Sequence, residues 1–370
     1  MSAEAWRLIT DDGVSAAFGL AADEQLALQV GQGASAPTLR LYTYRSHCAL
    51  VGRFQNMPTE LNRDFCAGAG IEVGRRPTGG GAILMGADQL GVALALPERR
   101  SARSYQRSRE LFARLSSGLL RALGGLGVEA GFRRKNDLEV GGRKIAGLGV
   151  YFPPPGGLLF HASLLVDLDV PLMLKVLHTP LEKLADKAVA TVAQRVTTLR
   201  RELGEDISVA EVRRRVARAY AEALEIDLHE SRFSREELGA IHRLERDKYA
   251  SQAWIDMAPL KPDLSASVQV KTEAGLLGVA LTLAGETIKS VYITGDFFVD
   301  EEALGALESA LRWHTSRREA LYRTLTGLEE KGVCLAGVST DVLVEALVGA
   351  CEGAKPQRRG GTGRGCFVNP

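Results

Sequence analysis

Short strand-like segments that follow one another closely place the strongest constraint on the fold of this chain. Residues Thr38–Tyr44 alternate in hydrophobicity with a period of two, as a half-buried strand does. Similar segments, separated by glycine-rich or polar turns, are Ile71–Arg75, Ala82–Met85, Leu90–Leu96, Leu138–Val140, Lys144–Tyr151 and Leu158–Leu168. Gly141 and Gly142 supply the positive φ angles of a tight hairpin turn. The spacing therefore predicts sheets in which antiparallel pairing dominates.

Helical patterns flank these strands. Apolar residues recur every four positions from Phe18 to Val30, which indicates an amphipathic helix. Two serine–glutamate pairs have the capping-box spacing that begins a helix: Ser208 with Glu211, and Ser234 with Glu237. The sequence therefore predicts a large α+β domain over residues 1–240, in which mainly antiparallel sheets are flanked by helices.

A second set of strand and helix patterns begins near Lys261. Three short strands are expected, and three helices after them: Ser265–Val270, Gly278–Ala284, Thr287–Ile293, then Asp300–His314, Ser316–Lys331 and Ser339–Gly349. Residues 241–353 are therefore predicted to form a smaller α+β accessory domain. The remaining residues, 354–370, are rich in glycine and arginine with little to bury, so we expect a flexible tail.

Composition excludes several classes of function. Lysine and arginine balance aspartate and glutamate to a net charge of +1, so no global field favours nucleic acid or an anionic membrane as a partner. No apolar run approaches the ~20 residues of a membrane span, and the acidic start does not match a signal peptide. We therefore expect a cytoplasmic protein. Its five cysteines are odd in number and far apart, and we interpret them as reduced thiols.

Three consecutive glycines carry the clearest chemical signal. Gly79, Gly80 and Gly81 follow Arg75 and Arg76 and lie between two predicted strands. Glycine backbone N–H groups can surround an anion, and arginine binds phosphate or carboxylate oxygens through charge-assisted hydrogen bonds. The segment lacks the GK[ST] end of a phosphate-binding P-loop. A flexible turn with two solvated arginines is an equally good interpretation of the glycines alone.

A lysine in a glycine-flanked apolar strand is the second candidate. Lys144 could bridge a carboxylate and a phosphate, although a surface lysine is the commoner case. Asp137 could orient it or help to bind Mg²⁺, and its simpler role is in the turn beside Asn136. A lone histidine such as His161, within an apolar strand, is more often a core residue than a catalyst.

Six segments in the same order resemble the lipoate-protein ligase family, which has the biotin/lipoate ligase fold. They extend over about residues 15–240 and read FGLAADEQLA, VGRFQN, RRPTGGGAI, KNDLEVGGRKIAG, LLFHASLLVDL and KLADKAVATVAQRVTTL. The region from Trp254 to VYITGDFF is similar to the accessory domain of these ligases. The chain departs from the family at Met85, where a histidine is usual, and in its arginine- and glycine-rich tail.

The resemblance implies a site built from these segments, with Lys144 as the catalytic lysine. The other residues that it implies for substrate and adenylate binding are Arg75, Arg76, Thr78, Gly79, Gly80, Gly81, Ala82, Asn136, Asp137, Gly147, His161 and Ser163. It also implies that the substrates are ATP with Mg²⁺ and lipoate or octanoate. The acid would be activated to an acyl-AMP and transferred to a lysine of a lipoyl-domain carrier protein. Candidate carriers are a 2-oxoacid dehydrogenase acyltransferase component, the glycine-cleavage carrier or another lipoate-binding protein.

Three alternatives remain open at this point. An octanoyltransferase of the same fold takes its acyl group from a carrier thioester and uses a catalytic cysteine. One transferase group has that cysteine just before the position of Asn136, where this chain has GFRRK, and no cysteine occurs between Cys66 and Cys334. A biotin ligase is disfavoured because its glycine loop differs. A non-catalytic lipoate- or carrier-binding protein would keep the pocket without turnover.

Overall fold

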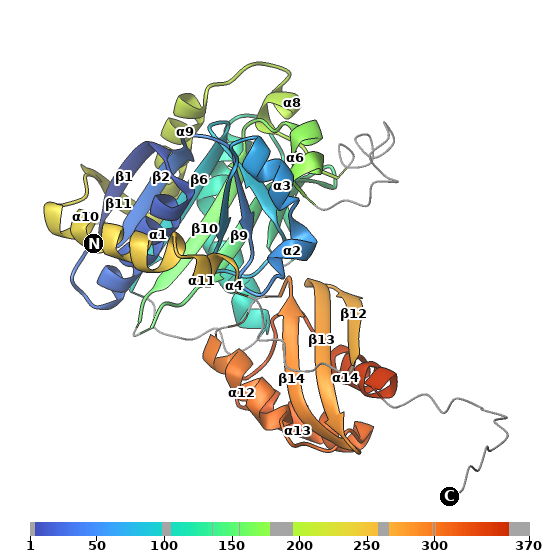
Figure 1. Cartoon of the computed structure of the whole chain (residues 1–370). Coiled ribbons are helices and arrows are strands. Elements are labelled where there is room, and N and C mark those ends of the chain that lie inside the picture. The colour runs from blue at the N-terminus through green and yellow to red at the C-terminus, as the bar shows by residue number, and fades with distance from the viewer. Residues whose placement is uncertain are drawn as a thin grey trace, which may run out of the picture.

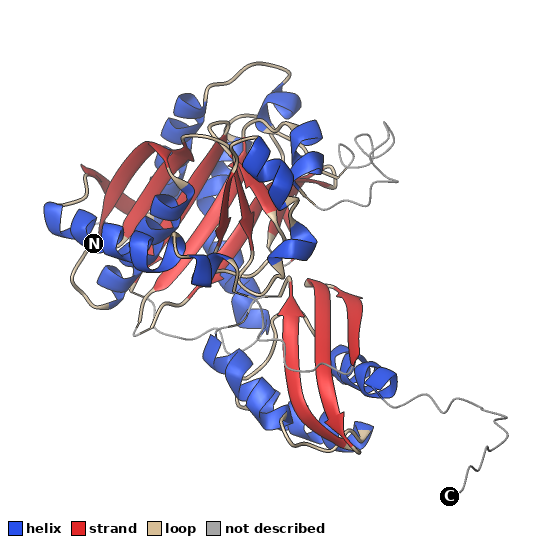
Figure 2. Ribbon diagram, viewed as in Figure 1, coloured by secondary structure: helices blue, strands red, loops and turns tan. Residues whose placement is uncertain are grey.

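The chain forms a large domain around an eight-stranded sheet and a smaller α+β unit (Figures 1 and 2). The computed structural model describes residues 4–97, 105–134, 136–154, 156–177, 195–257, 266–297, 299 and 301–354. The expected tail, apart from Ala354, lies outside the described residues. Over the described part of the chain, no helix combines the length and the apolar character that a membrane span requires.

The eight-stranded sheet has the order β11-β1-β2-β6-β10-β9-β8-β7. Its strands are β1 (Glu4–Val14), β2 (Thr38–Tyr44), β6 (Gln89–Leu96), β7 (Gly131–Arg134), β8 (Asp137–Val140), β9 (Arg143–Tyr151), β10 (Leu158–Leu165) and β11 (Ile226–Ser231). Pairing is antiparallel from β2 to β7, while β1 lies parallel to both β2 and β11. The predicted class, mainly antiparallel sheet with flanking helices, is confirmed.

A three-stranded sheet carries the glycine-rich loop. It has the order β4-β3-β5, with β3 (Cys48–Val51) between β4 (Glu72–Arg75) and β5 (Ile83–Met85). Because residues 76–82 connect the two outer strands, this loop crosses the end of β3. The Gly141–Gly142 turn between β8 and β9 has φ angles of 54° and 81°, so the predicted hairpin is confirmed.

Helices cover both faces of the large sheet. On one face, α5 and α9 bury residues such as Leu119 and Val216 against Leu39 and Leu41. On the other, α1 and α10 pack on the opposite side of the same strands, where Tyr42 lies. The helices that the structure describes in this domain are α1 (Ala16–Gly31), α2 (Met57–Glu60), α3 (Arg63–Gly68), α4 (Tyr105–Leu115), α5 (Ser117–Gly124), α6 (Val170–Val176), α8 (Leu199–Leu203), α9 (Val209–Leu224), α10 (Arg235–Leu244), a π-helical turn at Glu245–Tyr249, and α11 (Gln252–Ile255).

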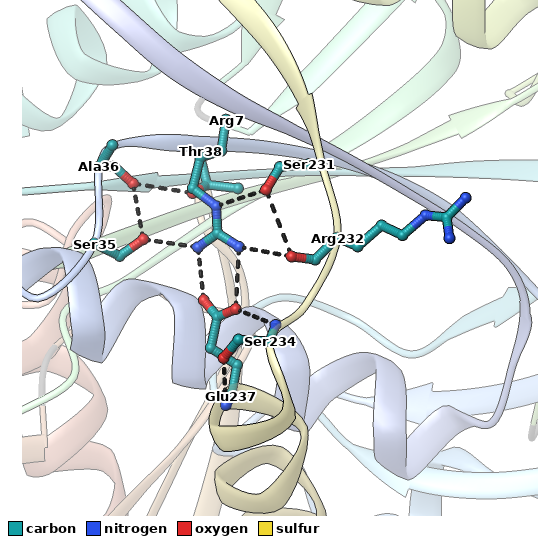
Figure 3. A network of polar contacts seen from close by, with 8 residues as sticks. All are labelled: Arg7, Ser35, Ala36, Thr38, Ser231, Arg232, Ser234 and Glu237. Atoms are coloured by element: carbon teal, nitrogen blue, oxygen red, sulfur yellow. Dashed lines mark hydrogen bonds and ion pairs between the residues drawn. The ribbon is translucent and has the colours of Figure 1, made fainter.

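A polar network fixes α10 to the edge of the large sheet (Figure 3). Arg7 on β1 donates to the Glu237 carboxylate at 2.6 Å and to Ser35 Oγ at 2.7 Å. Ser234 and Glu237 form both halves of a capping box, as the sequence predicts. At Ser208 only one half forms, because the carboxylate of Glu211 pairs with neighbouring arginines instead.

The accessory domain packs a three-stranded antiparallel sheet against three helices. Its elements are β12 (Ala266–Thr272), β13 (Gly275–Ala284), β14 (Thr287–Gly295), α12 (Glu301–Leu311), α13 (Arg318–Glu330) and α14 (Thr340–Ala354). Ile241, Tyr249 and Trp254 belong to the core that α1 forms on the large sheet. The boundary expected after residue 240 divides that core, so we propose that the accessory domain begins between residues 257 and 266.

Candidate functional site

A cavity of about 530 Å³, including its open mouth, lies between the glycine-rich loop and the large sheet. Polar groups line it from Arg76, Thr78, Asn136, Lys144, His161 and Ser163, together with Gly79, Gly80, Gly81 and Gly147. Apolar side chains and two tyrosines line the rest: Leu20, Tyr42, Tyr44, Leu50, Ile83, Met85, Leu148 and Ala162. The cavity therefore joins a cationic, glycine-rich region to an apolar one, as an amphipathic acid requires.

Lys144 lies near the start of β9 and is held from both sides. Its Nζ is 2.7 Å from Asp137 Oδ1 on the paired strand β8. Its backbone N–H donates to Arg195 O at 2.8 Å, and its carbonyl accepts from Thr197 N at 2.9 Å. A Cβ on Gly147 would lie 3.0 Å from this Nζ, so a glycine there leaves room for the amine. Lys144 is thus a fixed cation at the cavity wall.

Arg76 shapes the glycine-rich loop from within. Its guanidinium donates to the carbonyls of Leu50 at 2.6 Å, Gly81 at 2.9 Å and Gly79 at 3.3 Å. Burial lowers the pKa of Arg76 to about 10, so it stays charged at neutral pH. Gly80 has a φ of 95°, which a side chain would strain. The predicted loop is therefore a braced structure rather than a flexible turn with solvated arginines.

The loop is also attached to the sheet. Thr78 Oγ1 lies 2.8 Å from His161 Nε2, which projects from β10. Burial, with a smaller contribution from nearby Arg76, lowers the pKa of His161 to about 3, so the ring is neutral at physiological pH. A Cβ on Gly149 would lie 2.6 Å from His161 Nε2, so this glycine admits the imidazole. His161 thus lies at the site, in contact with the loop.

Arg75 lies outside the cavity lining, unlike Arg76. It is 1% exposed, and its guanidinium donates to carbonyls of two backbone segments. These acceptors are Gly52 O, Arg53 O, Gln55 O, Trp254 O and Ile255 O, at 2.7–3.2 Å. Ala82 and Asp137 also do not line the cavity, although Asp137 contacts Lys144. The structure therefore brings most, but not all, of the predicted residues together.

The apolar wall of the cavity was not predicted from the sequence as a binding surface. Leu20 from α1 and Leu50 from β3 look like ordinary core residues in their own elements. Tyr42 and Tyr44 carry a usable signal, because their separation by two places both rings on one face of β2. Met85, where a histidine is usual in the family, is 3% exposed and belongs to the same wall.

Neither a metal cluster nor a thiol is present at this site in the described part of the chain. No group of three or more His, Cys, Asp or Glu side chains there is placed to hold a metal ion. Four cysteines are described, and none of them lines the cavity: Cys48, Cys66, Cys334 and Cys351. Burial raises the pKa of the Cys48 thiol well above its usual value, which opposes formation of a thiolate there.

Comparison with known proteins agrees with the resemblance. The family model for the lipoyl protein ligase A/B catalytic domain matches residues 15–221. An octanoyltransferase LipM from Symbiobacterium thermophilum is 30% identical over 271 residues, which cover 67% of this chain and 97% of that protein. Other relatives, from Brevibacillus brevis and Bacillus subtilis, carry the same name. By name, these relatives favour the octanoyltransferase alternative over the ATP-dependent ligase.

Two solved structures share the fold. A bi-partite lipoate protein ligase, described with its E2 lipoyl domain from Thermoplasma acidophilum, is 26% identical with a TM-score of 0.62. The match covers 71% of this chain and 100% of the ligase chain. The P. falciparum LipL1 structure, in complex with lipoate, has a TM-score of 0.64 at 16% identity and covers 88% of this chain and 98% of its own. This second match shows a shared fold alone.

Proposed function

We propose that this chain, which belongs to the lipoyl protein ligase A/B family, transfers an octanoyl or lipoyl group to a lysine of a lipoyl-domain carrier. The observation that carries the proposal is the position of Lys144. Its amine lies in a cavity that is also lined by the braced glycine-rich loop, by the polar residues Asn136, His161 and Ser163, and by an apolar wall. Such a cavity suits a short-chain acid whose carboxyl group is activated, because the charged carboxyl group requires polar partners and the hydrocarbon chain of the acid requires apolar ones.

We further propose that the activated form is an acyl-adenylate made from ATP. A thioester-dependent transferase of this fold needs a cysteine at the reacting carbon, and none of the described cysteines lines the cavity. The region before Asn136, where one transferase group has its cysteine, reads GFRRK. The charge of Arg76 at the cavity wall instead suits a phosphate-linked donor.

The length of the chain distinguishes it from the LipM relative but does not decide the acyl donor, since the ligase from T. acidophilum also matches only 71% of this chain. The LipM relative is matched over 97% of its length by only 67% of this chain, which leaves about a third without a counterpart there. The LipL1 fold, in contrast, extends over 88% of this chain. The fold shared with LipL1 therefore extends over residues of this chain that have no counterpart in LipM.

The proposed reaction has two steps. The acid carboxylate attacks the α-phosphorus of ATP, and the bond to pyrophosphate breaks as the acyl-phosphate bond forms. The carrier amine, once deprotonated, then attacks the acyl carbonyl, and AMP leaves with the oxygen. Lys144 and the loop N–H groups would stabilise the negative charge on the carbonyl and phosphate oxygens in both steps. The enclosed site would limit hydrolysis of the intermediate.

Asp137 would be the protein's contribution to Mg²⁺ binding. Mg²⁺ in nucleotide sites is usually held by one or two carboxylates together with substrate phosphates. Asp137 does not line the cavity, but it contacts the cavity-lining Lys144, so it would supply a carboxylate next to the cavity wall. When bound, Mg²⁺ would offset the charge of the triphosphate. Asn136, which lines the cavity one residue earlier, would bind on the same nucleotide side.

One experiment decides between the two donors. Pyrophosphate release from ATP and Mg²⁺ is measured with octanoate or lipoate for the wild type and Lys144→Ala, and the mass of an added lipoyl domain is then determined. The ligase proposal expects acid-dependent release and a mass gain, both lost in the variant. Acylation from an octanoyl-carrier thioester without ATP would instead establish the octanoyltransferase, which the names of the relatives favour. If neither activity is detected, the non-catalytic binding protein is the remaining alternative.

A further inference from the structure

Two sequence segments with no role so far meet at the boundary between the domains. VGRFQN begins at Val51, the last residue of β3 in the small sheet. VYITGDFF begins at Val291 in β14 and continues past the end of that strand at Gly295. Gln55 Nε2 of the first donates to Asp296 Oδ1 of the second at 3.1 Å. Gln55 is only 4% exposed, so its carboxamide is a buried polar group whose partners matter energetically.

The other end of the Gln55 carboxamide holds the turn that supports the glycine-rich loop. Its Oε1 accepts from Gly52 N at 2.8 Å. Gly52 lies against the loop so closely that a Cβ there would be 2.0 Å from Gly80 O. The next residue, Arg53, donates its N–H to Thr78 O at 2.8 Å. A displacement of Gly52 would therefore displace the glycine-rich loop that forms the cavity wall.

From these contacts we propose that Gln55 is a positioning residue that couples the seating of the accessory domain to the shape of the glycine-rich loop. Asp296 is its fixed reference point, because Asp296 Oδ2 accepts from Leu276 N at 3.0 Å and Asp296 N donates to Leu276 O at 2.9 Å. The carboxamide then fixes Gly52 relative to Asp296 through its hydrogen bond, and Gly52 in turn packs against Gly80. Its effect on catalysis rests on the proposed function, whereas the coupling itself does not.

The docking of the two domains does not depend on Gln55 alone. Phe54 and Phe297 stack with ring centroids 5.3 Å apart and an interplanar angle of 20°. Gly295 N also donates to Phe54 O at 3.2 Å. These contacts join the domains independently of the carboxamide. A variant at Gln55 can therefore leave the domains in contact while it removes the hydrogen bond that links Asp296 to the loop. Such a variant distinguishes coupling to the loop from the mere association of the domains.

Gln55→Glu isolates the link between the domains. When both carboxyl groups are ionised, the one at position 55 can still accept from Gly52 N, but it cannot donate to Asp296, and the two carboxylates repel. The matched rescue is the exchange Gln55→Glu with Asp296→Asn. In that double variant the new amide can donate to the carboxylate at position 55 while its oxygen accepts from Leu276 N. Comparison with both single variants makes this a double-mutant cycle.

Amide hydrogen exchange, read by mass spectrometry on the full chain, tests the coupling without any substrate. Residues 74–80 are all buried, so exchange in the peptide that spans them reports on the loop. Gln55→Glu should raise its rate about tenfold, with recovery in the double variant and no comparable change in β12–β14. An unchanged loop would overturn the proposal. Equal acceleration in β12–β14 would also overturn it, because Gln55 would then only hold the domains together.

The catalytic readout is kcat/KM for the acyl donor that the wild type uses, which is either octanoate with ATP or the octanoyl-carrier thioester. The coupling predicts a fall of about tenfold in Gln55→Glu and recovery to within about threefold in the exchange variant. Unchanged kcat/KM alongside faster loop exchange would refute the catalytic role of the coupling. If the wild type transfers no acyl group from either donor, the proposed function fails, and the exchange data still decide whether Gln55 couples the domains.

Discussion

The neutral state of His161 makes the stability of the catalytic domain depend on pH in a predictable way. Burial beneath the loop lowers the pKa of this imidazole to about 3. In the unfolded chain it titrates near its ordinary value of about 6.5. Between these values the unfolded state binds a proton that the folded state does not, so stability falls as pH decreases through the unfolded pKa.

The size of this effect follows from the two pKa values. A solution at pH 5 lies about 1.5 pH units below the pKa of the imidazole in the unfolded chain. Protonation of the unfolded state therefore lowers the free energy of unfolding by about 2 kcal/mol relative to pH 8. The result hardly changes for any folded pKa below about 4, because the folded ring is then unprotonated at pH 5. His161→Gln removes the titrating group and retains a polar atom that can reach Thr78 Oγ1.

The measurement is urea unfolding of the wild type and His161→Gln at pH 8 and pH 5. Both are made in a Trp313→Phe background, because Trp313 is 61% exposed in the accessory domain while Trp6 and Trp254 are buried in the large one. Fluorescence then reports on the catalytic domain. His229→Gln, at an exposed position on β11, controls for loss of one imidazole. A stability difference between wild type and His161→Gln that is equal at both pH values, within about 0.5 kcal/mol, would refute the reasoning.

Three further predictions concern the cavity. Lys144→Ala should lower kcat for acyl transfer at least about a hundredfold while leaving the unfolding midpoint nearly unchanged, and a loss below tenfold would contradict its assigned role. Gly52→Ala should reduce activity about tenfold or more, because its Cβ would meet Gly80 O at 2.0 Å, whereas Gly68→Ala is a matched control with no atom within 4 Å. Cys48→Ala should retain acyl transfer within about threefold in a steady-state assay, and its complete loss would argue for a thiol-dependent transferase.

Local patterns in the sequence account for much of this site. The Gly141–Gly142 turn requires positive φ angles, and its position fixes β8 and β9 so that Lys144 faces Asp137. The glycine run required a loop between strands, and the structure has one between β4 and β5. In each case neighbours in the sequence determine the geometry, so a local rule is sufficient.

Features that depend on distant residues could not be predicted in this way. Arg75 was grouped with Arg76, but it binds the carbonyls of Trp254 and Ile255, about 180 residues later. Nothing in the local sequence distinguishes an arginine that lines the cavity from one that lies outside it. Strand β1, which lies between β11 and β2, was also missed, because its burial does not alternate and its partner β11 lies more than 200 residues away.

The choice of acyl donor is the hardest property to derive from the fold, for a chemical reason. A ligase and a thioester-dependent transferase both need an apolar pocket and a cation near the reacting carbonyl, so Lys144 and the glycine-rich loop serve either reaction equally. The two reactions differ in the leaving group, which requires either cations for a triphosphate or a thiol that can carry the acyl group. Arg76 remains charged at the cavity wall, while the Cys48 thiol is buried and resists ionisation. Our proposal of an adenylate therefore rests on side-chain chemistry at the cavity wall, whereas the names of the relatives favour the thioester.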